Sequence, residues 1–553
     1  MTARAPSAHR DTFCREMLPP RALWPEMRYD RIPGLAYPPR LNCATELLDR
    51  MVERGSGDEP VFRFPGGVWT YRQLLETSNR IANVLVSDLG LVPGNRVLLR
   101  GPNNPMLVAC WFAVLKAGGV VVCTMPLLRP REICYTADRA RITLALTDAR
   151  LAADCEEGMR RTGAGEPRAG VRLVRFGAPG AEPEPGSLES MMAGKAAAFR
   201  NVDTAADDVA LIAFTSGTTG RGKGTMHFHR DVLAICDCFP PHILRAGPDD
   251  IFAGSPPLAF TFGLGGLVLF PMRIGASAIL LEQAAPALLL AGMREFGATV
   301  CFTAPTAYRA MLPLLGDGGG IPSLRTCVSA GETLPAPTFE AWERATGIRI
   351  IDGIGATEML HIFISATPEE MRAGATGRPV PGYEARVVDE DGEQVSSGVI
   401  GRLAVRGPTG CRYLDDEERQ RAYVQNGWNL TGDSYLVDDD GYFRYQARTD
   451  DMIISAGHNI AGPEVETVLL EHAAVQECGV VGVPDEERGQ IVKAFVVLRP
   501  GSTPGPELVR ELQDHVKREI APHKYPRQIE FVDALPRTAT GKLQRFRLRE
   551  EQR

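Results

Sequence analysis

The chain has 553 residues and a formal net charge of −7, with 61 basic against 68 acidic side chains. Hydrophobic residues make up 44% and charged residues 23%, which is typical of a globular protein and excludes a disordered chain, a collagen-like repeat and a coiled-coil rod. The acidic balance argues against a broad nucleic-acid-binding face.

No secretory signal is visible at the N-terminus, and no apolar run reaches the ~20 residues that a membrane-spanning helix needs. The 12 cysteines are scattered without a CxxC pair. From the cysteines we expect buried thiols, no disulfide framework and a cytoplasmic protein. We also expect no membrane association, and a monomer or a homodimer.

Strand-like and helix-like patterns alternate over the first two thirds of the chain. A buried helix is expected over Met106–Lys116. Residues 156–200, rich in Gly, Pro, Ala and Glu, are predicted to form a loose surface excursion. The alternation predicts an α/β fold with doubly wound parallel sheets, whose binding loops lie at the carboxyl ends of strands. Strands are expected at 96–100, 120–123, 144–147, 171–174, 209–214, 299–302, 326–329 and 349–352.

The pattern changes near residue 380. Residues 384–393 predict a hairpin that turns at Asp391-Gly392, and further strand-like runs indicate a small β subdomain. The last hundred residues predict an α+β module. We therefore expect an N-terminal domain over 1–449 and a C-terminal domain over 450–553. The expected elements of the module are helices at 463–472 and 506–520 and strands at 475–483, 491–498 and 528–532.

A loop rich in glycine and hydroxyl groups, Thr215–Gly224, follows the buried strand at 209–214. Backbone N–H groups and Lys223 make it a candidate phosphate-binding loop. The alternative is a strand-to-helix turn without a ligand. Gly217, Gly222 and Lys223 have the spacing of a nucleotide-hydrolase P-loop, but Gly224 stands where a Ser or Thr would hold Mg²⁺. The residues assigned to phosphate binding are Thr215, Ser216, Gly217, Thr218, Thr219, Gly220 and Lys223.

Five motifs in a fixed order resemble those of the adenylate-forming enzymes, the superfamily of acyl-CoA synthetases, peptide-synthetase adenylation domains and luciferases. The resemblance extends over about residues 40 to 548. The motifs are Thr215–Gly224, Asp352-Gly-Ile-Gly-Ala-Thr-Glu358, Leu430-Thr-Gly-Asp433, Arg448-Thr-Asp-Asp-Met-Ile453 and Pro536-Arg-Thr-Ala-Thr-Gly-Lys542.

The resemblance implies a reaction in which a carboxylate attacks the α-phosphate of ATP, pyrophosphate leaves, and a thiol then displaces AMP. ATP, Mg²⁺ and coenzyme A would be required. Lys542 would bridge the carboxylate and the α-phosphate, Thr357 would donate to that phosphate, and Glu358 would hold Mg²⁺. Asp433 would accept the ribose hydroxyls and Arg448 would add a further ribose contact. The implied adenine slot is formed by Gly331, Glu332, Asp352, Gly353 and Ile354.

The C-terminal domain would swing about Asp450 between the two half-reactions. One orientation would bring Lys542 to the phosphate. The other would bring Ala456, Gly457 and His458 to the thiol side of the site.

Two segments resemble the acid pocket of the benzoate–CoA ligase branch, and especially of 2-aminobenzoate–CoA ligases. They are Phe260-Thr-Phe-Gly-Leu-Gly265 and Thr357-Glu-Met-Leu-His361. We assign Thr261, Phe262, Gly355 and His361 to this pocket, because a flat ring prefers aromatic and aliphatic walls with few polar groups. The alternative for His361 is a core histidine bonded to a backbone carbonyl. His227 and His229 are interpreted as packing or surface residues.

The leading hypothesis is an ATP-dependent ligase that joins benzoate or 2-aminobenzoate to CoA. A close alternative loads the aryl group onto a carrier-protein thiol. More distant alternatives are a P-loop phosphohydrolase or kinase and a binding-only relative without catalysis.

Overall fold

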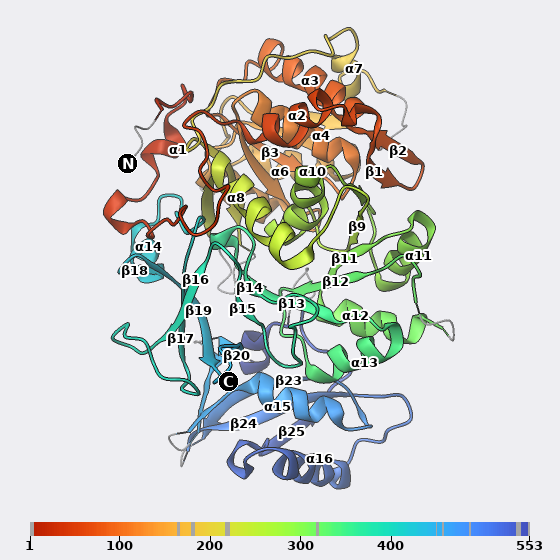
Figure 1. Ribbon diagram of the computed structural model, residues 1–553, viewed down its shortest axis with the longest axis vertical. Coiled ribbons are helices and arrows are strands. Elements are labelled where there is room, and N and C mark those ends of the chain that lie inside the picture. Colours follow the sequence, from red (N-terminus) through yellow and green to blue (C-terminus); the bar gives the residue numbers. More distant parts are fainter. Residues whose placement is uncertain are drawn as a thin grey trace.

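The computed structural model describes residues 5–162, 166–177, 183–215, 222–316, 320–448, 451–455, 458–485, 488–537 and 543–550. Figure 1 shows a large upper body, built from the chain up to about residue 450, and a smaller C-terminal module below it. The architecture is mixed α/β, as the sequence predicts, with large sheets in the body and a separate small sheet in the C-terminal module.

The first sheet has the strand order β6-β5-β3-β4-β7-β8. Its strands run parallel from β6 to β7, whereas β7 and β8 form an antiparallel hairpin. Every residue of β3 and of β5 is buried, as expected of parallel strands covered on both faces. The bounds are β3 Arg96–Arg100, β4 Val120–Thr124, β5 Leu144–Asp148, β6 Arg172–Phe176, β7 Val209–Phe214 and β8 Gly224–Phe228.

The strand predicted at 171–174 is confirmed as β6, which pairs with β5 along its whole length. The expectation of a loose excursion over residues 156–200 is therefore too broad, and this stretch also contains the short helix α7 (Leu188–Met192). The Gly-rich loop leads from β7 into the strand β8, which excludes the alternative of a strand-to-helix turn. A P-loop is followed at once by a helix, so this hairpin contradicts the phosphohydrolase alternative.

The second sheet has the order β15-β14-β13-β12-β11-β9-β10-β1-β2. Its central strands, from β1 through β10, β9, β11 and β12 to β13, are parallel, and its margins are antiparallel. The bounds are β1 Pro60–Phe64, β2 Gly67–Thr70, β9 Ile251–Gly254, β10 Ser277–Ile279, β11 Val300–Thr303, β12 Thr326–Ala330, β13 Ile350–Gly355, β14 Ile362–Ser365 and β15 Arg378–Pro379.

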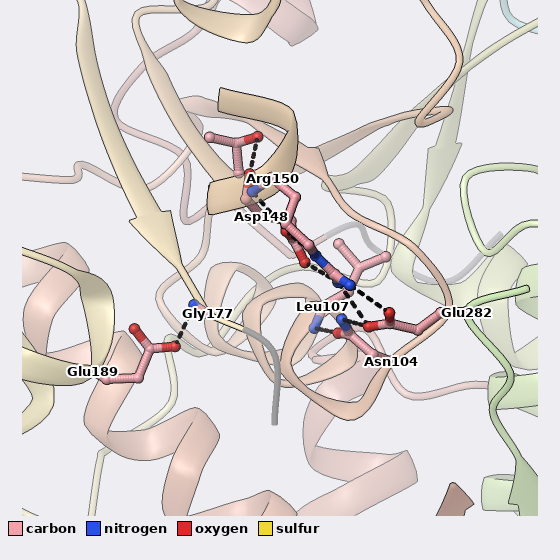
Figure 2. Close-up of polar contacts among 8 residues, drawn as sticks. Asn104, Leu107, Asp148, Arg150, Gly177, Glu189 and Glu282 are labelled. Carbon is pink, nitrogen blue, oxygen red and sulfur yellow. Dashed lines mark hydrogen bonds and ion pairs between the residues drawn. The ribbon is translucent and has the colours of Figure 1, made fainter. Parts of the chain in front are cut away.

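A cluster of charged and polar side chains joins the two sheets (Figure 2). Arg150, just after β5, donates at 2.7 Å to the fully buried Asp148 and at 2.7 Å to Glu282, which follows β10. Asn104 donates to the same Glu282 carboxylate at 2.9 Å, and it caps helix α4 by accepting from the Leu107 N–H. These contacts therefore connect the carboxyl end of β5 in the first sheet, the start of α4 and the segment after β10 of the second sheet.

Helix α4 (Pro105–Lys116) forms part of the core as predicted, and all of its residues are buried. Its buried Lys116 ammonium pairs with Asp49 at 2.6 Å. Further helices of the body are α1 Phe13–Glu16, α2 Arg50–Glu53, α3 Tyr71–Ser87, α5 Pro130–Arg139, α6 Ala152–Arg160, α8 His229–Phe239, α9 Thr261–Leu264, α10 Phe270–Ile274, α11 Pro286–Phe296, α12 Pro305–Met311, α13 Ala336–Thr346 and α14 Glu417–Tyr423.

The predicted β subdomain is an antiparallel sheet of order β16-β17-β19-β18, with β20 added on β19. The chain does turn at 389–393, but β16 takes β17 as its strand partner and meets Gln394 in a single bridge only. The predicted turn is therefore present, and the predicted hairpin partner is wrong. The bounds are β16 Glu384–Val388, β17 Gly401–Arg406, β18 Val424–Gln425, β19 Trp428–Val437 and β20 Phe443–Arg448.

The C-terminal module has a hairpin of β23 and β24, with β25 parallel to β24 and α15 packed against β23. A separate hairpin of β21 and β22 precedes it. The predicted boundary at 449/450 lies outside the described residues and stays a prediction. The bounds are β21 Ile453–Ser455, β22 His458–Ile460, α15 Gly462–Glu471, β23 Val475–Asp485, β24 Gly489–Leu498, α16 Pro506–Glu519, β25 Gln528–Phe531 and α17 Arg545–Glu550.

All 12 cysteines are free, and most are buried, as predicted. Among the helices in the described ranges, none is both long and apolar enough to cross a membrane.

Candidate active site

The turn that follows β13 carries two of the predicted catalytic residues near the centre of the molecule (Figure 1). Thr357 and Glu358 lie in a single 3-10 turn, Thr357–Met359, and Leu360 follows with a φ of +70°, a left-handed conformation rare for leucine. His227 on β8 donates from Nε2 to the Thr357 carbonyl oxygen at 2.8 Å. Burial lowers the pKa of His227 to about 4, so the ring is neutral at pH 7. A strand of the first sheet thus supports a turn of the second.

Glu358 is nearly buried, with 8% of its surface exposed. The Tyr413 hydroxyl donates to its Oε1 at 2.6 Å. Carboxylate and phosphate oxygens suit Mg²⁺, so this side chain fits the predicted metal role. Within the described ranges, no group of three or more His, Cys, Asp or Glu side chains could hold a metal ion. Mg²⁺ at Glu358 would take its further ligands from phosphate oxygens and water.

The ends of the predicted phosphate loop are held together. The Thr215 N–H donates to the Lys223 carbonyl at 2.9 Å, and the Lys223 N–H donates to the Thr215 hydroxyl at 3.1 Å. The Lys223 ammonium lies 5.7 Å from the centre of the Tyr413 ring, within cation–π range. Tyr413 therefore contacts both the loop lysine and Glu358. The intervening Ser216, Gly217, Thr218, Thr219 and Gly220 lie outside the described residues.

The two predicted ribose ligands are neighbours on adjacent strands. Asp433 on β19 and Arg448 on β20 are paired in register, and Arg448 donates to the Asp433 carboxylate at 3.1 Å. Arg448 also donates to the Thr431 carbonyl at 3.1 Å. Asp433 is 8% exposed. The pair leaves a positioned carboxylate that can accept hydrogen bonds from hydroxyl groups.

The residues of the predicted adenine slot lie together at the carboxyl ends of β12 and β13. Ala330 pairs with Gly353, so Gly331 and Glu332 follow β12 beside Ile354. Oδ1 of Asp352 is enclosed and has no hydrogen-bond partner among the described residues. Its burial raises the pKa of Asp352 to about 8, so this carboxyl is largely protonated at pH 7.

His361 lies in a cage of aromatic rings. Its ring centre is 4.4 Å from that of Phe270, 5.7 Å from those of Phe239 and Phe262, and 6.4 Å from that of Phe302. Burial lowers the pKa of His361 to about 3, so the imidazole is neutral. The Phe262 backbone slightly opposes that shift, but neither ring nitrogen meets a partner in hydrogen-bond geometry within the described residues. The alternative of a core histidine satisfied by a backbone carbonyl is not what this geometry shows.

Two glycines make room for His361. A Cβ at Gly265 would lie 2.3 Å from Cδ2 of the imidazole, and one at Gly355 would lie 2.8 Å from the His361 carbonyl group. Phe262 and Thr261 lie on the short helix α9 and are half-buried, and the Phe262 ring is one wall of the cage. The structure therefore brings the four residues assigned to the acid pocket to one region, directly beside the turn with Glu358.

The C-terminal module contacts the nucleotide side of the site. Arg537, in the predicted lysine motif, lies 3.7 Å from Glu332 of the body and 2.8 Å from Glu477 on β23. Glu477 also pairs with Arg309 of α12 at 3.2 Å. The backbone of His458 is part of β22. Lys542, Asp450, Ala456 and Gly457 lie outside the described residues, so their roles stay predictions.

Sequence reasoning missed two residues that support the site. His227 is fully buried, which confirms the packing alternative and excludes the surface one, but its contact with the Thr357 turn was not predicted. Tyr413 was not identified at all. No local pattern distinguishes it, because its contacts with Glu358 and Lys223 join segments far apart in the chain.

Comparison with known proteins agrees with this geometry. The AMP-binding enzyme family model matches residues 48–412, and the AMP-binding enzyme C-terminal domain matches residues 464–542. The chain therefore belongs to the AMP-binding enzyme family, which confirms the adenylate-forming superfamily predicted from its motifs.

Its similarities within that family confirm the benzoate–CoA ligase branch. The chain is 36% identical to the benzoate–CoA ligase of Thauera aromatica over 522 residues, covering 94% of this chain and 97% of that protein. The crystal structure of the anthranilate CoA ligase AuaEII in complex with anthranoyl-AMP is similar, with a TM-score of 0.86, 34% identity and coverage of 94% and 98%. A benzoate CoA ligase from Burkholderia xenovorans has a TM-score of 0.83, 34% identity and coverage of 92% and 100%.

Proposed function

We propose that this protein is an ATP-dependent aryl-CoA ligase that activates a benzoate-type acid, with benzoate and 2-aminobenzoate as the favoured substrates. The observation that carries the acid assignment is the neutral His361 among four phenylalanine rings, three residues from Glu358. Such walls suit a flat ring, and a free imidazole nitrogen can bond one polar group on it. The names of the relatives support the same class.

The first half-reaction joins two anions. An oxygen of the aryl carboxylate forms a bond to the α-phosphorus of ATP while the bond to pyrophosphate breaks. Lys223 and the phosphate loop would hold the triphosphate, Thr357 would donate to the α-phosphate, and Lys542 would reduce the repulsion between the anions. Mg²⁺ held by Glu358 and phosphate oxygens would supply further positive charge.

In the second half-reaction the CoA thiolate attacks the acyl carbon of the aryl-AMP, and AMP leaves with the bonding electron pair. The segment with Ala456, Gly457 and His458 would lie beside the thiol. The carboxylate of Asp433 would hold the ribose of AMP through both steps.

CoA is the proposed acceptor, with a carrier-protein thiol as the competing one. We further propose a cytoplasmic, monomeric or homodimeric enzyme. Its 12 free cysteines support a reducing compartment.

The test is acid-dependent pyrophosphate release with ATP and Mg²⁺ across benzoate, 2-aminobenzoate, 2-hydroxybenzoate, phenylacetate, cinnamate and a medium-chain fatty acid. A maximum at benzoate or 2-aminobenzoate is expected. A maximum at the fatty acid would refute the acid assignment. Replacing CoA by a phosphopantetheinyl carrier in the same assay distinguishes the two acceptors.

A further inference from the structure

The segment that contains Tyr413 is bound to the strand leaving the phosphate loop. The Met226 N–H donates to the Arg412 carbonyl and the Leu414 N–H donates to the Gly224 carbonyl, both at 2.8 Å. Thr225 lies opposite Tyr413 in the resulting antiparallel bridge. Lys223 directly precedes this strand, so the backbone that places Lys223 also places Tyr413.

A buried ion pair holds the same segment from its other side. Arg412 donates to Asp231 on α8 at 2.8 Å, and both side chains are fully buried. The Arg412 guanidinium also lies 4.0 Å from the centre of the Phe228 ring. Removing one partner of such a pair leaves an uncompensated buried charge, so movement of the segment away from Asp231 is costly.

The Tyr413 ring faces the two charged groups of the nucleotide side. Its hydroxyl donates to Glu358 Oε1 at 2.6 Å, and its face lies 5.7 Å from the Lys223 ammonium. One Glu358 oxygen is therefore occupied, and the other is left for a cation.

We propose that Tyr413 is a positioning residue that holds Glu358 and Lys223 in register, so that the carboxylate binds the metal of a metal–triphosphate whose phosphates the lysine contacts. The proposal rests on the proposed function only in taking the ligand to be metal-bound ATP. Removing a partner that orients a metal ligand typically lowers metal affinity 10- to 100-fold.

The experiment compares Tyr413→Phe with a matched control, Tyr423→Phe. The Tyr423 ring packs edge-on against Tyr413 at 5.7 Å, and its buried hydroxyl has no hydrogen-bond partner in the described part of the chain. The probe is Mn²⁺·ATP, followed by the electron paramagnetic resonance of free Mn²⁺ without any aryl acid. We expect Tyr413→Phe to weaken Mn²⁺·ATP about tenfold, and Tyr423→Phe to change it less than twofold.

A double-mutant cycle with Glu358→Gln separates positioning from a general loss of structure. If Tyr413 acts through Glu358, adding Tyr413→Phe to Glu358→Gln weakens Mn²⁺·ATP less than twofold further. The proposal would be overturned if the losses of Mn²⁺·ATP affinity in the two single variants multiplied in the double variant. Equal losses in the two tyrosine variants would also overturn it. Failure of the aryl-acid assay with normal Mn²⁺·ATP binding would instead overturn the proposed substrate class and leave this inference intact.

Discussion

On the nucleotide side of the turn at 357–361, each charged side chain is held by a partner: Glu358 by Tyr413 and Asp433 by Arg448. On the acid side, His361 is enclosed by aromatic rings and its nitrogens have no hydrogen-bond partner among the described residues. The first arrangement presents charge that is already oriented toward a charged ligand. The second keeps a polar group neutral and available, which burial permits because imidazole loses its charge at little cost.

Substitutions on the two sides should therefore impair different properties of the enzyme. Changes on the nucleotide side should affect ATP use or charge stabilisation for every acid. Changes on the acid side should alter the choice of acid and leave ATP use unchanged.

The largest effect is expected for Lys542→Ala, which removes positive charge where two anions meet. Adenylation, measured as ATP–pyrophosphate exchange, should fall about 100- to 1,000-fold. Thioester formation from supplied aryl-AMP should be largely spared. Lys517→Ala, whose ammonium pairs with Asp514 on α16, is the control and should change neither rate. An equal loss of both half-reactions would contradict the assignment of Lys542 to the first step.

Asp433→Asn should raise the KM for ATP about tenfold or more, because hydrogen bonds to a charged acceptor contribute about 1.5–3 kcal/mol. The KM for the aryl acid should remain unchanged in steady-state kinetics. Asp438→Asn, which disrupts a comparable pair with Arg444 at 2.9 Å in the same subdomain, controls for local loosening. Similar changes in both variants would show that Asp433 is structural.

His361→Leu tests the acid side while keeping side-chain volume similar. If His361 bonds the ortho amino group, kcat/KM should fall about tenfold more for 2-aminobenzoate than for benzoate, and the KM for ATP should stay constant. Equal losses for the two acids would indicate a bond to the shared carboxylate instead. Gly265→Ala should also impair acid use selectively, because its Cβ would displace the imidazole. A raised KM for ATP in either variant would contradict the expectation that changes on the acid side leave ATP use unchanged.

Asp352→Asn is expected to have the smallest effect on ATP use, because a protonated carboxyl and an amide are similar in shape and polarity, and its main effect should be on stability. Because burial raises the pKa of Asp352 to about 8, the folded protein retains a proton that the unfolded chain releases near pH 4. As the pH rises from about 4 to about 8, the free energy of unfolding should therefore decline, and the Asn variant should lack this part of the decline. At about 1.4 kcal/mol per pH unit, the loss of unfolding free energy between pH 5 and pH 8, measured with urea, should be smaller in the variant by about 4 kcal/mol.

Asp438→Asn is the control for that measurement. Hydrogen bonds and Arg444 offset burial and lower the pKa of Asp438, so its contribution changes only at acidic pH. Its stability profile between pH 5 and 8 should run parallel to that of the unmodified protein. A parallel profile for Asp352→Asn as well would show that Asp352 is ionised in the folded protein.

Most of the fold could be predicted from sequence because buried strands such as 96–100 and 209–214 have strong local apolar patterns. The errors arose where pairing is non-local. Residues 384–393 contain a good turn, yet β16 gains more hydrogen bonds from β17 than from the segment directly after the turn. The apolar pattern at 171–174 did predict β6, although the surrounding sequence is rich in loop-forming residues, but only the pairing with β5 shows its place in the sheet.

The adenylating class could be predicted from the amino-acid sequence, since glycines, hydroxyls, carboxylates and lysines recur in five ordered motifs. Phe262 and His361 also indicated the apolar character of the acid pocket. The support of the Thr357 turn by His227, and the contacts of Tyr413 with Glu358 and Lys223, became visible only in the folded structure. The physical reason is that a hydrogen bond depends on distance and direction between side chains, and residues 223, 358 and 413 meet only after two sheets have packed together.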